Sequence, residues 1–198
     1  IKFHVDATNL SEIGKLFGQP ELGGSAIADG TLTGNATSVR TSGTISGNDI
    51  TYKGNEALEL SGTFDVQVPE LAVADARIGG ELAANFVKVG GVEINDVRAK
   101  IAFAAQQLDF STNLKHDSRE LDAAGKVIFH PDHQELHLPT LAIRAEGQEW
   151  RLVSGTEAAI QYGADKLTVL NPKLVNGDQT IAADGVQSVD HHDVIGRG

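Results

Sequence analysis

The sequence predicts an all-β fold with one short helix near its start. Three observations support this: apolar and polar residues alternate along most of the chain, turn-forming residues separate the alternating runs, and only one segment has helical spacing. Alternation with a period of two places apolar side chains on one face of a strand. We therefore expect strands with one apolar face and one polar face.

The helical segment is "NLSEIGKLFGQP", residues 9–20. Asn9 is a suitable N-cap, and Glu12 follows three residues later, as in a capping box. Three apolar residues lie on one face of the predicted helix: Ile13, Leu16 and Phe17. Gly18 and Pro20 then end it.

Alternating runs fill the rest of the chain. Examples of apolar residues with one parity are Ile1, Phe3, Val5 and Ala7; Leu58, Leu60, Phe64, Val66 and Val68; Val97, Ala99, Ile101 and Phe103; and Leu108, Phe110 and Leu114. Turn signals between runs are Lys53–Asn55, Gly90–Gly91, Pro131–Gln134, Glu146–Gln148, Gly163–Asp165 and Asn176–Asp178. Because these turns join neighbouring strands directly, we expect an antiparallel meander of roughly a dozen strands. We expect one elongated domain over residues 1–188 and an irregular tail over 189–198.

Composition limits the classes of partner. The chain has 198 residues and a formal net charge of -11, so a nucleic-acid partner is not expected, because such binding needs a basic surface. There is no cysteine, which excludes thiolate chemistry and cysteine-based zinc sites. The chain begins at Ile1 within an alternating run, and we therefore expect a segment of a longer protein.

The apolar face of such a sheet must be covered. Two sheets can close on each other as a sandwich, or one long sheet can fold over along its length and leave an apolar trough. Small residues at inward parity would fill a sandwich core poorly and leave room for a guest: Ala26, Ala28, Gly30, Gly43, Gly62, Ala99, Ala123 and Gly125.

The densest group of chemically active side chains is in "FHPDHQELH", residues 129–137. Imidazoles and carboxylates at this spacing can ligate zinc. If Phe129 pairs with Leu136 across the turn, however, His130 lies opposite Glu135, His137 lies opposite Ile128, and His133 lies on the loop tip. The side chains then spread along a solvated face without converging. We expect a polar hairpin and no metal site, and the role of the three histidines stays open.

Other site signals are weak. "DHHD", residues 190–193, lies in a non-periodic segment that is typical of a frayed terminus. No nucleophile elbow, P-loop or dinucleotide-binding motif occurs, and one Trp and two Tyr are few for a carbohydrate cleft. We therefore expect neither catalytic residues nor a cofactor.

Two segments resemble a known family. "GQEWRLVSGTEAAIQYGADKLTVLNPKLVNGDQTIAADG", residues 147–185, is similar to the recurrent segment of the TamB/AsmA-like proteins, the repeating β-groove superfamily, through Trp150, Leu152, Ile160, Leu167, Val169, Leu174, Gly177, Asp178, Gln179, Ile181 and Gly185. "GTISGNDITYKGNEALELSG", residues 43–62, resembles another unit of that family through Gly43, Ile45, Gly47, Asp49, Ile50, Tyr52 and Gly54. With the segment 9–35, the resemblance extends from Asn9 to Gly185. Pro172 departs from the family pattern, because it interrupts an expected strand.

The resemblance implies an elongated antiparallel meander curled lengthwise into a groove, apolar within and polar outside. It implies a periplasmic segment of an inner-membrane-anchored bacterial envelope protein that shields phospholipid acyl chains between the inner and outer membranes. A partner β-barrel of the outer membrane would bind through other parts of the parent protein. The residues expected to line the groove are Ile45, Phe64, Val66, Ile101, Phe103, Phe110, Phe129, Leu138, Ile143, Trp150, Leu152, Ile160, Leu167 and Val169.

Two alternatives differ in what covers the apolar face or the sheet edge. The first is a scaffold or chaperone that accepts strands of outer-membrane β-barrel proteins at an open edge. The second is a closed β-sandwich with a structural or adhesive role. An open trough predicts bound lipid, an open edge predicts bound peptide, and a sandwich predicts a dry core.

Overall fold

The computed structural model describes residues 1–16, 18–163, 166–170, 172–183 and 185–188. These residues form one open antiparallel sheet with a single short helix, α1 (Leu10–Leu16), and one 3-10 turn, η1 (Val73–Asp75). The strands are β1 (Lys2–Ala7), β2 (Gly23–Asn35), β3 (Ser38–Tyr52), β4 (Asn55–Pro69), β5 (Arg77–Val89), β6 (Val92–Ala104), β7 (Gln107–His116), β8 (Arg119–Phe129), β9 (His133–Ala145), β10 (Gln148–Leu152), β11 (Ala158–Gly163), β12 (Lys166–Leu170), β13 (Lys173–Asn176), β14 (Gln179–Ala182) and β15 (Gly185–Ser188). The predicted all-β class is confirmed.

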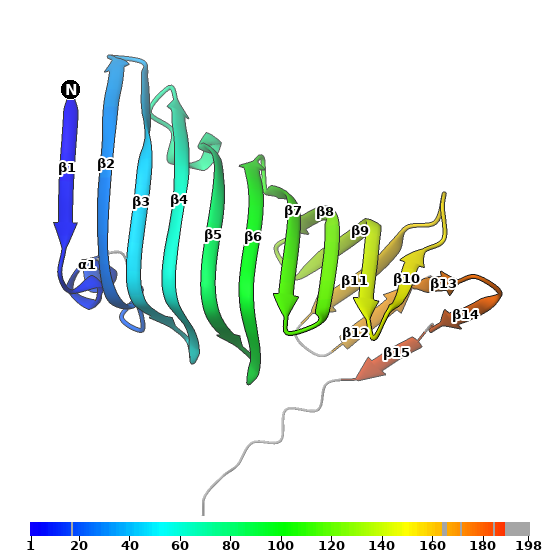
Figure 1. Cartoon of the computed structure of the whole chain (residues 1–198). Helices are drawn as coiled ribbons and strands as arrows, with labels where there is room; N and C mark the ends of the chain where they lie inside the picture. Colours follow the sequence, from blue (N-terminus) through cyan, green and yellow to red (C-terminus); the bar gives the residue numbers. More distant parts are fainter. Residues whose placement is uncertain (17, 164–165, 171, 184, 189–198) are drawn as a thin grey trace, which may run out of the picture.

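The strands from β1 to β10 form the predicted meander. Each pairs antiparallel with the next in the chain, and β1 to β9 lie side by side (Figure 1). No second sheet lies against this one in the described part of the chain, so the closed sandwich is wrong. The helix α1 contacts β2 at one end of the sheet.

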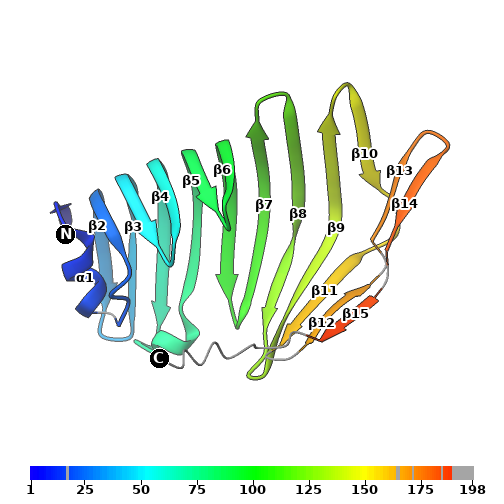
Figure 2. The ribbon, with the colours of Figure 1, turned by 90° about the horizontal axis from the view of Figure 1, so that it is seen from below.

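The sheet forks at β9, which the meander did not predict. Residues 133–138 of β9 pair with β11, whereas residues 142–145 pair with β10. One branch continues through β11, β12 and β15, and the other through β10, β13 and β14 (Figure 2). Pro139 lies between the two paired stretches, opposite a register shift between Ala124 and Lys126. Because proline has no backbone N–H to donate to a ladder, it suits this gap.

Asn9 caps the helix as predicted. Its side-chain oxygen accepts hydrogen bonds from the backbone N–H of Ser11 at 3.0 Å and from the Ser11 hydroxyl at 2.7 Å. The described contacts of Glu12 are to Lys15 Nζ at 2.9 Å rather than back to the cap. The start of the helix is therefore fixed by Asn9, and Glu12 adds an exposed ion pair of small value.

Gly18 ends the helix as predicted. Its φ is +69°, its N–H donates to the Lys15 carbonyl at 3.2 Å, and the N–H of Gln19 donates to the Gly14 carbonyl at 2.7 Å. These two bonds form a Schellman motif, which glycine favours because it has no Cβ to clash. The predicted apolar face includes Phe17, which lies outside the described residues.

Short turns connect the strands where the sequence places them. The residue pairs Lys53–Gly54, Gly90–Gly91 and Glu146–Gly147 each have two positive φ angles, as type I′ hairpin turns require. Ala105–Gln106 forms a similar turn without glycine, with φ of 49° and 63°, and no turn was predicted at these residues. The predicted turn at 163–165 lies partly outside the described residues.

The sheet has almost no buried core. Within the described residues no large side chain is fully buried, and the buried apolar residues are Ala7, Ala123, Leu152 and Ala158. A single-layer sheet buries side chains only against their neighbours on the same face. Its apolar face therefore remains open to contact.

Candidate functional site

The ladder register places the predicted groove residues on one face. Ile101 pairs with Phe110, and Phe110 pairs with Gly125, so these positions share a face across three strands. The same reasoning through every ladder gives one common face for Ile45, Phe64, Val66, Ile101, Phe103, Phe110, Phe129, Leu138, Ile143, Trp150, Leu152, Ile160, Leu167 and Val169. We call this face the trough; that these residues hold lipid stays a prediction.

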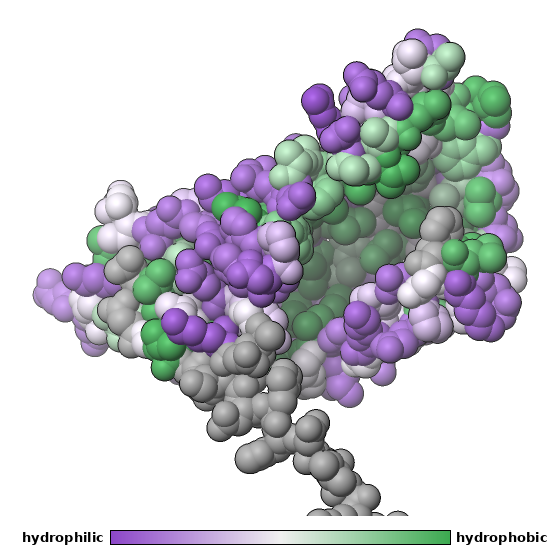
Figure 3. Space-filling model, turned by 180° about the vertical axis from the view of Figure 1, so that it is seen from behind, coloured by the Kyte–Doolittle hydropathy of each residue, from purple (hydrophilic) through white to green (hydrophobic). Residues whose placement is uncertain are grey.

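The trough is hollowed and apolar. Figure 3 shows a concavity lined by hydrophobic residues, with hydrophilic residues along its rims. Leu152 is buried, Phe129 is 39% exposed, and the other twelve predicted lining residues are half-buried. Phe103 and Phe129 meet edge to face, with ring centroids 6.1 Å apart. These side chains are accessible from solvent and offer a continuous apolar surface.

Glycines on the trough face allow the sheet to curl. A Cβ at Gly43 would lie 2.0 Å from the Asp29 carbonyl oxygen, and a Cβ at Gly125 would lie 2.0 Å from that of His137. Gly79, on the opposite face, would meet nothing closer than 3.8 Å. At these two glycines the neighbouring strand therefore approaches too closely on the trough side for a Cβ atom. The small residues permit this curvature; that they also leave space for a guest stays a prediction.

The β8–β9 hairpin differs from the predicted register. The N–H of His130 donates to the His133 carbonyl at 2.9 Å, so Pro131 and Asp132 alone form the turn. Phe129 then pairs with Gln134 rather than with Leu136. This shift moves His133 from the loop tip into the ladder. The expectation that the side chains spread without converging is therefore wrong.

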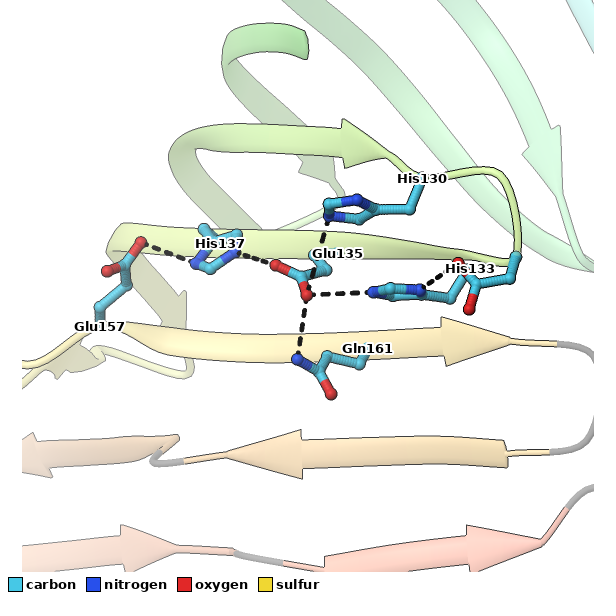
Figure 4. A network of polar contacts seen from close by, with 7 residues as sticks. His130, His133, Glu135, His137, Glu157 and Gln161 are labelled. Atoms are coloured by element: carbon cyan, nitrogen blue, oxygen red, sulfur yellow. Dashed lines mark hydrogen bonds and ion pairs between the residues drawn. The ribbon is translucent and has the colours of Figure 1, made fainter. Parts of the chain in front are cut away.

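On the face opposite the trough, three histidine side chains meet around one carboxylate. The Glu135 Oε1 atom lies 3.1 Å from His133 Nε2 and 3.9 Å from His130 Nε2, and its Oε2 atom lies 3.0 Å from His137 Nε2 (Figure 4). The His130 and His133 rings stack with centroids 4.4 Å apart. The spacing His133–Glu135–His137 puts all three on one face of β9, and the tight turn adds His130.

The charges in this cluster shift each other's titration. Hydrogen bonds from His137 and then His133 hold the pKa of Glu135 below its usual value. Hydrogen bonds to Asp132 and then Glu135 raise the pKa of His133 above its usual value. Glu135 and His133 therefore form a hydrogen-bonded pair in which each favours the charged form of the other.

A second polar cluster lies on the same face, around Arg144. Its guanidinium pairs with Asp122, with Glu149 at 2.7 Å and with Glu120 at 3.3 Å. The Asn113 amide donates to Glu120 at 2.6 Å and to Asp122 at 2.7 Å. These contacts, with Asn113 as the largest cause, lower the pKa of both carboxyl groups. The cluster links β7 to β10 and leaves no cation without a partner, as expected of a structural network.

The other sequence features considered as sites do not yield a further candidate site among the described residues. The segment 190–193 lies outside the described residues. In the part of the chain that the structure covers, no helix is long and apolar enough to cross a membrane. The trough and the histidine–carboxylate cluster are thus the two candidate sites.

Comparison with known proteins does not identify either site. No family model matches the chain, and neither the curated proteins nor the solved structures contain a match.

Proposed function

We propose that this chain binds lipid acyl chains in its trough. The observation that carries the proposal is the open apolar face: hydrophobic side chains share one side of a single-layer sheet and stay half-buried. Covering exposed apolar surface gains about 25 cal/mol per Å², or about 0.8 kcal/mol per buried methylene. An acyl chain provides such cover without a specific polar partner.

The dimensions suit a passive conduit. The nine adjacent strands β1 to β9 are spaced by about 4.8 Å each, so the trough extends for roughly 40 Å, more than one extended acyl chain needs. Tails would lie along the apolar floor while headgroups remain at the polar rims. No catalytic step is part of this proposal.

The biological setting follows from the resemblance to the TamB/AsmA-like family. We place the chain in the periplasmic part of an inner-membrane-anchored bacterial envelope protein that moves phospholipid between membranes or supports outer-membrane biogenesis. The open trough supports this setting, since a water-filled compartment is where acyl chains need shielding.

The decisive experiment is gentle purification followed by solvent extraction and mass spectrometry, against a heat-denatured sample. We expect stoichiometric phospholipid from the unmodified chain, and its loss from Phe103→Asp and Phe129→Asp, because each places a carboxylate on the trough floor. Ile27→Asp is the matched control, since Ile27 lies on the opposite face and is 41% exposed. A folded chain that yields a lipid-free extract would sink the proposal.

A second candidate function is strand acceptance, which the free sheet edges favour. Among the described residues, β1 pairs only with β2, and β14 only with β13. Ile1 and Leu32 exchange hydrogen bonds, so alternation directs the N–H of Asp6 toward the free edge. Asp6→Pro would remove that donor and spare the β1–β2 ladder. Loss of binding to β-strand peptides with unchanged lipid binding would assign the function to the edge.

A further inference from the structure

The histidine–carboxylate cluster contains a ligand set that the trough does not use. The ligand atoms of His130, His133 and Glu135 lie within 4.8 Å of one another. We propose that these three side chains bind a divalent transition-metal ion, with zinc as the best match. Two imidazoles and one carboxylate are a ligand set that zinc accepts in proteins, with a fourth position left for water.

The distances suit a tetrahedral ion. Bonds of about 2.0–2.2 Å to nitrogen and oxygen place neighbouring ligand atoms about 3.3–3.5 Å apart. The separations between Glu135 Oε1 and the Nε2 atoms of His133 and His130 are 3.1 Å and 3.9 Å. An ion between these atoms therefore requires shifts of only a few tenths of an ångström along those two edges.

The ligands are oriented by partners behind them. Asp132 Oδ1 lies 2.9 Å from His133 Nδ1, which fixes that ring with Nε2 directed toward Glu135 Oε1, where the ion would bind. His137 Nε2 holds the second oxygen of Glu135 at 3.0 Å, and Gln161 donates to the first at 3.1 Å. Such partners behind metal ligands typically change affinity by 10–100-fold when removed. A chance meeting of exposed side chains lacks this support.

One ring must turn when the ion binds. The rings of His130 and His133 are stacked at an interplanar angle of 15°, so their lone pairs lie in nearly parallel planes. We expect His130 to rotate about χ2 so that its lone pair points at the ion. Its side chain is 39% exposed, which leaves space for that rotation.

Metal binding would lock the hairpin that carries part of the trough. His130 follows β8, and His133 and Glu135 begin β9, so one ion ties the two strands at their turn. Phe129 lies on the other face of the same hairpin. An ion that binds only the folded chain stabilises it by mass action. We therefore infer a structural role for the ion, independent of lipid.

The test uses the full chain, delipidated and metal-free, titrated with zinc chloride by calorimetry and followed by thermal unfolding. We expect one ion per chain and a rise in Tm with zinc. His133→Ala and Glu135→Gln should each weaken binding at least 100-fold, and His137→Ala should weaken it about 10–100-fold. Tm without zinc checks that each variant folds.

Two controls separate this site from other imidazoles. His116→Ala should bind zinc as the unmodified chain does, because His116 lies outside the cluster. The double variant His191→Ala/His192→Ala, in the segment outside the described residues, should also retain the tight site. Binding that disappears in the double variant, or that survives unchanged in His133→Ala and Glu135→Gln, overturns the proposal.

Discussion

The replacement Phe129→Ala measures how much one ring contributes to acyl-chain binding. A phenylalanine side chain offers roughly 200 Å² of contact surface, and 39% exposure leaves about 80 Å² of it open on the trough. At about 25 cal/mol per Å², covering that area is worth about 2 kcal/mol. Removal of the ring should therefore weaken binding about 30-fold.

The free protein should tolerate this change. Phe129 has one aromatic neighbour, Phe103, at 6.1 Å, and an edge-to-face pair contributes about 0.5–1.5 kcal/mol. The assay is titration with a fluorescent acyl-chain analogue, read by anisotropy, with Tm measured in parallel. Ile27→Ala is the matched control, because its side chain is 41% exposed on the opposite face. A Phe129→Ala affinity within two-fold of the unmodified chain, or equal losses in both variants, would refute the reasoning.

Two further predictions concern the sheet itself. Gly80→Ala should lower the free energy of unfolding by about 1–3 kcal/mol, because its Cβ would lie 2.4 Å from the Thr63 carbonyl oxygen. Gly79→Ala should raise the free energy of unfolding by about 0.4–1 kcal/mol, because its Cβ would meet nothing closer than 3.8 Å and alanine restricts the unfolded chain. Urea titration of both variants measures the difference, and equal effects would contradict the link between these glycines and the curl of the sheet. Asn113→Ala should move the acid-unfolding midpoint to higher pH. The hydrogen bonds from Asn113 lower the pKa values of Glu120 and Asp122 in the folded chain. The stabilisation from these carboxylates is therefore present above the usual carboxyl pKa and is lost as the pH falls through the lowered values, and without Asn113 that loss begins at higher pH. Circular dichroism during acid titration checks this, and an unchanged midpoint would mean that Asn113 does not hold these carboxylates.

The sequence predicted the apolar face because that face depends on parity alone. Every residue from Ile45 to Val169 that alternation assigned to the interior lies on one side of the ladders. The two ends of the helix, at Asn9 and Gly18, were also predicted, because each depends on one residue type at one position and not on distant contacts.

The fork and the histidine cluster were missed because both depend on register over distance. Pro139 was a visible signal within an expected strand, but its consequence depends on which strands reach β9 from either side. At the other site, a turn of two residues in place of a longer loop changed which side chains face each other. Phe129 lies opposite Gln134 instead of Leu136, and this two-residue difference in register places His130 beside His133 and Glu135.

The absence of a shared core in the described part of the sheet affects how the chain unfolds. Substantial contacts join strands that are hydrogen-bonded neighbours, so each described strand is held by the one or two beside it, except β9, which is held by three. Such a molecule behaves as a one-dimensional array, in which stability is a sum of nearest-neighbour terms. Unfolding should proceed inward from the outermost strands, and amide exchange should be slowest near the middle of the array. The cooperativity of unfolding then depends on how many neighbouring strands are coupled in sequence along the sheet.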